Sequence, residues 1–205
     1  MIWESWPWKY YLWKDAAALE KAMSRKALSL GTQRSEWAVS KLERTLFTAA
    51  FSIRKLIDSQ KLSDECLAYS IPAERFPAAG ARRPDLMNWH HFDKHFDTGS
   101  PTLCRLRTRD LCNLLIHSFQ FFFTYDEDMH LDGLLVSSDR YRTTWLYRVD
   151  LKDAIEWVRY VATDDVDLTE MKRTPKGDIK VTKARRWQEA VQDMREYLQR
   201  CERGH

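Results

Sequence analysis

Glycine is scarce in this sequence, and the glycines present form no cluster. Six glycines are spread over 205 residues. The chain therefore has no glycine-rich loop able to cradle phosphates, and no glycine-flanked serine of the kind found at a strand-to-helix nucleophile turn. Nucleotide hydrolases and dinucleotide oxidoreductases are poor candidates for this reason.

Paired cysteines, long apolar runs and a strong net charge are also missing. The four cysteines include no Cys-x-x-Cys pair, which argues against a zinc knuckle or a disulfide framework. No apolar run reaches the roughly 18 residues of a membrane span, and the N-terminus lacks the order of a secretory signal. We expect a cytoplasmic protein with no membrane partner. The net charge of +3 is far below that of a general nucleic-acid coat, although local basic patches are compatible with it.

Aromatic residues, in contrast, are abundant. They make up 13% of the chain and include nine tryptophans, so we expect one main core and a single domain over residues 1–205. Six rings lie in the first thirteen residues: Trp3, Trp6, Trp8, Tyr10, Tyr11 and Trp13. This opening is interpreted as a strap over the core or as a surface for a partner. Because a small core does not readily hide so many rings, we expect a homodimer or a stable protein partner.

Periodicity predicts a fold of the α+β class that is mostly α. Apolar residues recur at helical spacing in five stretches, near residues 15–30, 35–60, 106–123, 150–162 and 184–201. Two pairs of short apolar runs, within residues 134–149 and 167–182, predict antiparallel hairpins. Prolines and glycines interrupt residues 62–101, which we interpret as a long loop. The expected architecture is a helical bundle edged by short antiparallel β-hairpins.

The stretch Thr108–Phe123 has the most informative pattern, because it combines an apolar face with a polar stripe. Asp110, Asn113 and His117 are three and four residues apart, which places a carboxylate, an amide and an imidazole one above another on a helix. Imidazole is the usual acid or base near neutral pH. The same residues would also suit hydrogen bonds to a partner helix, so the stripe suggests a site without identifying a reaction.

A second pair of polar residues lies on the long helix expected at residues 35–60. Glu43 and Arg54 are eleven residues apart, close to three helical turns, and so share one face. Two interpretations are open for this pair. It belongs to a site, or it is a solvated pair on an exposed face.

The segment CNLLIHSF, residues 112–119, resembles the signature helix of HEPN domains, whose hallmark is Arg, four residues and then His, often with Asn directly after the Arg. Asn113 and His117 match the Asn and the His, whereas Cys112 stands where the family has Arg. The long helix before this segment is also similar to the family's layout. The resemblance covers residues 15–125, and residues 126–205 would form an extension.

The resemblance implies a metal-independent endoribonuclease, commonly dimeric, in which His and Arg assist attack of a ribose 2′-hydroxyl on the adjacent phosphate. His117 and Asn113 would be central, with Arg109, Arg54 and Glu43 as helpers. A thiol has no fixed charge, so Cys112 cannot replace the guanidinium. Arg109, one turn before Asn113, and Arg54 are the candidates to do so. A bacterial toxin or phage-defence component that binds or cleaves RNA is the first functional hypothesis.

Other interpretations of these residues lead to a different function. Asn113 and His117 can be buried polar groups paired with a neighbouring element. Cys112 can be a small apolar core residue rather than a nucleophile. The alternative function is therefore a non-catalytic protein–protein interaction module built on a degenerate HEPN-like bundle. A basic segment, residues 172–186, is either a ridge that contacts phosphates or a solvated face.

The segment NWHHFDKHFD, residues 88–97, is the remaining candidate site. Its three histidines and two aspartates are all metal-ligating types, but their spacing matches no standard zinc or calcium motif. Trp89, Phe92 and Phe96 stand three and four residues apart, which is typical of a short helix with one aromatic face. We therefore expect no metal and no cofactor, with the aromatic rings buried and the His and Asp side chains in solvent.

Overall fold

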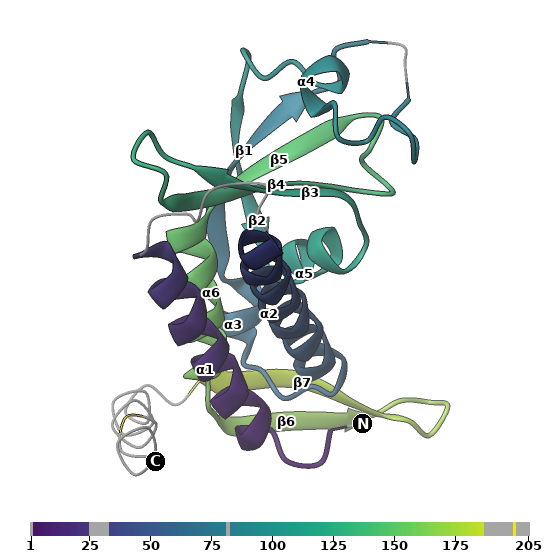
Figure 1. The fold of residues 1–205 in the computed structure, drawn as a ribbon. Helices are drawn as coiled ribbons and strands as arrows, with labels where there is room; N and C mark the ends of the chain where they lie inside the picture. Colours follow the sequence, from purple (N-terminus) through teal and green to yellow (C-terminus); the bar gives the residue numbers. More distant parts are fainter. Residues whose placement is uncertain (1, 25–32, 81–82, 187–198, 200–205) are drawn as a thin grey trace.

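The computed structural model describes residues 2–24, 33–80, 83–186 and 199 (Figure 1). The helices of this part of the chain are α1 (Trp6–Met23), α2 (Gln33–Asp58), α3 (Asp64–Ala68), α4 (Phe92–His95), α5 (Thr108–Ile116) and α6 (Leu151–Ala162). Its strands are β1 (Ser70–Pro77), β2 (Thr102–Arg107), β3 (Ser118–Tyr125), β4 (Leu131–Ser138), β5 (Trp145–Asp150), β6 (Val166–Arg173) and β7 (Ile179–Arg186).

A central sheet organises the fold. Five antiparallel strands lie in the order β2-β1-β5-β4-β3, and β6 and β7 form a separate two-stranded sheet. The predicted, mostly α helical bundle is therefore wrong, and the molecule is a mixed α+β structure. The prediction failed because β1 lies in the segment interpreted as a loop, β3 lies mostly in the segment interpreted as a helix, and β2 lies where these two segments meet.

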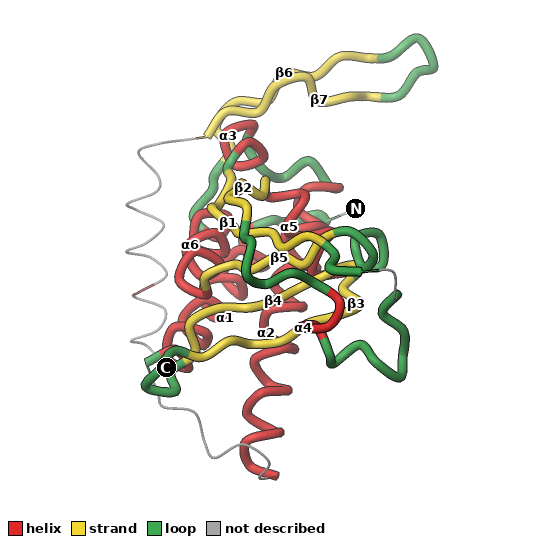
Figure 2. Tube along the Cα trace, turned by 90° about the horizontal axis from the view of Figure 1, so that it is seen from above, coloured by secondary structure: helices red, strands yellow, loops and turns green. Residues whose placement is uncertain are grey.

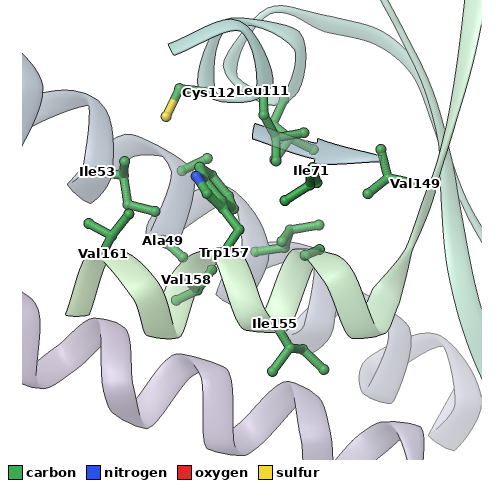
Figure 3. Packing of buried hydrophobic residues seen from close by; sticks show 14 of the residues in the cluster. Ala49, Ile53, Ile71, Leu111, Cys112, Val149, Ile155, Trp157, Val158 and Val161 are labelled. Atoms are coloured by element: carbon green, nitrogen blue, oxygen red, sulfur yellow. The ribbon is translucent and has the colours of Figure 1, made fainter. Parts of the chain in front are cut away.

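Helices α1, α2, α5 and α6 lie on one face of the central sheet and α4 on the other (Figure 1), and Figure 2 shows the strands lying across α1 and α2. The main core fills the space between α1, α2, α5, α6 and this face. Trp157 of α6 is 1% exposed and projects between Cys112 of α5 and Ile53 of α2 (Figure 3). A smaller core on the other face joins Phe76, Leu135 and Leu146 to Phe96, the residue after α4. The sheet is thus buried between two unequal layers.

The stretch Thr108–Phe123 is not one helix. Helix α5 ends at Ile116, and the aromatic residues that follow form β3, which pairs with β4. Phe121 and Phe123 contact the main core whereas Phe122 contacts the smaller one. This alternation suits a strand that contributes to two cores, and aromatic residues favour strands. The apolar spacing alone did not distinguish the two states.

Residues 62–101 are also more ordered than a loop. They contain α3, β1 and α4, and β2 follows directly. Strand β1 lies inside the sheet although it contains Pro72 and Pro77. Its pairing with β5 covers only Glu74–Pro77, so Pro72 pairs with β2 alone, and Pro77 ends the strand. Proline lacks an N–H donor, and these are positions where a strand tolerates that loss.

The aromatic N-terminus is the first part of a helix rather than a strap. Helix α1 begins at Trp6, well before the predicted start near residue 15, and Pro7 lies in its first turn. Proline suits this position because the first N–H groups of a helix have no intrahelical acceptor. Leu12, Ala16 and Leu19 are fully buried on one side of α1, and α1 packs beside α6 and α2 (Figure 1).

Several local predictions are confirmed. The long helix near residues 35–60 is α2, the helix near 150–162 is α6, and the two hairpins are β4–β5 and β6–β7. Asp150 is the N-cap residue of α6, but its side chain makes no capping hydrogen bond. The predicted helix at 184–201 is wrong at 184–186, which belong to β7, and most of its remainder lies outside the described residues. Among the described helices, none has the length and apolarity that crossing a membrane requires.

Candidate functional site

Two polar residues of α5, Arg109 and Asn113, contact the C-terminal half of α2. Leu111, Cys112, Leu114 and Leu115 are buried on one side of α5, which leaves Arg109, Asp110 and Asn113 on its polar side. The apolar face of this short helix packs into the core, so its polar side is directed to the surface beside α2. Side chains that are about 60 residues apart in sequence meet there.

Four of these side chains form a connected group, which we name the α2–α5 cluster: Arg54, Asp58, Arg109 and Asn113. Nε of Arg54 lies 3.1 and 3.0 Å from the two carboxylate oxygens of Asp58. Nη1 of Arg54 donates a hydrogen bond to Oδ1 of Asn113, and Nη1 of Arg109 lies 3.7 Å from Asp58. Two guanidinium groups therefore share one carboxylate, which leaves the cluster with an excess positive charge.

His117 lies next to this cluster, at the C-cap of α5, and is exposed. Its main-chain N–H donates to the carbonyl of Asn113 at 3.1 Å, and its own carbonyl accepts from the N–H of Asp139 at 3.0 Å. The turn after β4 is therefore close to His117, and it carries Arg142, 3.6 Å from Asp139. The imidazole lies at the surface rather than in the core.

Cys112 is fully buried, in agreement with its interpretation as an apolar core residue. Burial raises the pKa of its thiol to about 12, although Arg54 and Arg109 act in the opposite direction. The structure thus places two cations near Cys112. A thiol with so high a pKa is not a nucleophile at neutral pH. Arg54 and Arg109, the two candidates to replace the missing signature Arg, thus both lie near Cys112, which occupies the position of that Arg.

Glu43 is not part of this group. It lies eleven residues from Arg54 on α2, a distance of about 16 Å along the helix axis. It is half-buried, and burial raises the pKa of its carboxyl group. Asp58, in contrast, belongs to the cluster and was missed by the sequence analysis. Its position four residues after Arg54 was the available signal, because oppositely charged residues at that spacing are helix-surface neighbours.

The histidine-rich segment is a structural element in which one histidine is buried. His95 is 4% exposed, and its Nε2 lies 3.1 Å from the main-chain carbonyl of Asn88. The expectation that every histidine here is solvated is wrong, because His95 is the last residue of α4 and directly precedes Phe96, which packs on the sheet. Phe96 is buried as predicted, whereas Trp89 stays 37% exposed while it stacks on Phe122. No group of three metal-ligating side chains occurs among the described residues.

Comparison with known proteins found no match to a family model, to a curated protein or to a solved structure.

Proposed function

We propose that this protein binds RNA at the surface where α2 and α5 meet. The observation that carries the proposal is the pairing of Arg54 and Arg109 with a single carboxylate, Asp58, beside the exposed His117. Arginine is well suited to phosphate groups because its planar fork of donors matches their oxygens. The side chain of Arg109 is 50% exposed, so it is accessible to a phosphate.

The resemblance to HEPN domains adds a reaction to this proposal. His117 in its neutral form would accept the proton of a ribose 2′-hydroxyl as that oxygen attacks the adjacent phosphorus. The bond from phosphorus to the 5′-oxygen of the next nucleotide breaks, this oxygen takes a proton from water, and a 2′,3′-cyclic phosphate remains. Arg109 and Arg54 would hold the negative charge that develops on the phosphoryl oxygens. Asn113 would position Arg54 through their hydrogen bond. Cys112 takes no part in this chemistry because its thiol stays protonated.

Fluorescence anisotropy with a labelled single-stranded RNA of about 20 nucleotides tests the binding step. We expect Arg109→Ala to weaken binding and to lower the slope of log affinity against log salt by about one. Arg83→Ala is the matched control, since Arg83 is an exposed arginine that belongs neither to the cluster nor to the basic segment 172–186. Equal affinities for the two variants would contradict the proposal.

Gel analysis of the same RNA tests the reaction separately. We expect His117→Ala to abolish cleavage while leaving the affinity for RNA within about twofold of the original. If the unmodified protein binds RNA but does not cut it, the binding proposal stands and the proposed reaction is wrong. Cleavage that persists in His117→Ala would show that this imidazole is not the base.

A second candidate function is a protein–protein interaction module, and exposed aromatic rings near the N-terminus and on α1 and α2 favour it. Trp3 is 88% exposed, Tyr11 64% and Trp37 72%. Large exposed rings are typical of interfaces. We expect self-association with a dissociation constant of about 50 μM or tighter, which sedimentation equilibrium measures. The double change Trp3→Ser and Tyr11→Ser should weaken it, and a monomer at that concentration would count against self-association.

A further inference from the structure

A hollow of about 440 Å³ lies away from the α2–α5 cluster and shares no residue with it. It opens between the start of α1, the end of α2 and the β6–β7 hairpin. The residues that line it are Ser5, Lys9, Ser59, Gln60, Lys61, Asp165, Val166, Thr169, Met171, Ile179 and Val181. Polar residues come mainly from the two helix ends, and apolar residues come from the hairpin.

Lys9 is the unusual member of the polar wall, because it is a lysine only 2% exposed. Its Nζ donates to the main-chain carbonyl of Asp164, and an ammonium has two further protons to donate. Burial lowers the pKa of Lys9, while Asp164 and Asp165 act in the opposite direction. A lysine is rarely buried without a partner for its charge.

The end of α2 supplies the rest of the polar wall. Gln60 adopts a left-handed backbone with φ of 56°, and its N–H and that of Lys61 donate to the carbonyls of Ile57 and Leu56 at 3.0 Å. This is a Schellman ending, in which glycine is the usual residue at the position of Gln60. The turn places Ser59, Gln60 and Lys61 side by side at the rim of the hollow.

The opposite wall is apolar although it lies on a charged hairpin. Met171 and Ile179 are 62% and 58% exposed, and Met171 pairs with Val181 across the strands. Their sequence neighbours Lys172 and Lys180 are also exposed. Because side chains alternate between the two faces of a strand, the apolar residues share the face toward the hollow.

This wall is anchored to the rest of the molecule. The N–H of Ala184 donates to Asp64 at 3.0 Å, and the N–H of Arg186 donates to Glu65 at 3.2 Å. The carboxylate of Asp164 accepts hydrogen bonds from Ser63 at 2.9 and 2.6 Å and lies 3.7 Å from Arg186. Asp164 is therefore shared between Ser63, Arg186 and the nearby charge of Lys9. Among the described residues that line the hollow, Asp165 is the one carboxylate, against Lys9 and Lys61.

We propose that this hollow binds a small carboxylic acid with a linear apolar tail, whose carboxylate contacts Lys9 and Lys61 and whose tail lies against Met171, Ile179 and Val181. The excess of ammonium over carboxylate groups selects an anionic head. The hydroxyls of Ser5 and Ser59 and the amide of Gln60 offer further donors to it. Burying the tail shields apolar side chains that are otherwise in water.

Isothermal titration calorimetry of the full chain with octanoate tests this site. We expect saturable binding of one octanoate per chain, with a dissociation constant of about 0.1–1 mM. Acetate has the same head without the tail, and octan-1-ol has the same tail without the charge. Both should bind at least about tenfold more weakly. Hexanoate and decanoate complete the series, and failure of all three acids to saturate up to about 5 mM would overturn the proposal.

Variants locate the binding. Lys61→Gln should weaken octanoate binding about five- to tenfold by removing one ammonium group, and Ile179→Ser should weaken it by removing part of the apolar wall. Lys180→Gln is the matched control, because it removes a neighbouring exposed charge that does not line the hollow. Equal loss in Lys61→Gln and Lys180→Gln, or octan-1-ol that binds as tightly as octanoate, would contradict the site. None of these variants touches the proposed RNA surface, so the two proposals fail independently.

Discussion

Nε of Arg186 lies 3.7 Å from the carboxylate of Asp164, in an ion pair whose side chains are 8% and 0% exposed. Arg186 also donates to the carbonyl and the hydroxyl of Thr163 at 3.2 and 3.1 Å, and its guanidinium carbon lies 4.0 Å from the ring centre of Tyr160. The pair joins the end of α6 to β7, while Ser63 joins Asp164 to the start of α3. One carboxylate thus connects three segments of the chain.

We predict that Asp164→Asn destabilises the protein by about 3 kcal/mol or more, because it leaves the buried charges of Arg186 and Lys9 without this carboxylate. Urea unfolding followed by tryptophan fluorescence measures the change. Asp165→Asn is the control. Its carboxylate is half-buried and accepts from the N–H of Val166, so its loss should cost less than about 1 kcal/mol. Equal effects of the two changes would contradict this role of Asp164.

Gly133 permits the close approach of β3 and β5 to β4. A Cβ atom at this position would lie 2.8 Å from Oγ1 of Thr124 and 2.9 Å from the main-chain carbonyl of Val149. We predict that Gly133→Ala costs about 1–3 kcal/mol of unfolding free energy through this overlap. Gly80→Ala is the control, because no atom of the described residues beyond its chain neighbours lies within 4 Å of the added group. Thermal unfolding of both variants checks the difference, and a neutral Gly133→Ala would contradict it.

Cys112 should resist alkylation in the folded protein. Its thiol is buried and has a pKa of about 12, so almost no thiolate is present at pH 8. We expect iodoacetamide at that pH to leave Cys112 unmodified in the native state and to modify it fully in urea. Peptide mass spectrometry identifies the site. Rapid native labelling of Cys112 would show that α5 opens or that the thiol is exposed.

Asp15 should make stability depend on pH in the mildly acidic range. Burial raises the pKa of its carboxyl group from 3.8 to about 6 in the folded state. The folded state therefore binds a proton more tightly than the unfolded state, and the stability from this group is present below pH 3.8 and lost as pH rises toward 6. We predict that Asp15→Asn removes this loss and is more stable at pH 7 by about 1 kcal/mol.

Urea unfolding at several pH values between about 4 and 7 measures this effect. The difference in unfolding free energy between Asp15→Asn and the original protein should grow as pH rises through this range. A difference that stays constant with pH would show that Asp15 has the same pKa in the folded and unfolded states.

Local patterns predicted the elements whose stability is largely local. The apolar stripes of α2 and α6 are visible in the sequence, because a helix places residues three and four apart on one face. The hairpins β4–β5 and β6–β7 were also predicted, since each joins neighbouring runs through a short turn. In the candidate site, the polar spacing of Asn113 and His117 on α5 was likewise visible.

Other features of the fold and of the candidate site were decided only by the tertiary structure, because they depend on contacts between residues distant in sequence. The segment SFQFFFTY is a strand because β4 lies beside it and cores lie on both sides; its apolar spacing suited a helix equally well. Strand β1 exists despite two prolines because each proline pairs with one neighbouring strand only, Pro72 with β2 and Pro77 with β5. Arg54 meets Asn113 across 59 residues. The sequence by itself determined which faces of the helices and strands are apolar. The packing of those faces determined which polar side chains meet, because contacts between two elements depend on how the elements are placed relative to each other and not on local periodicity.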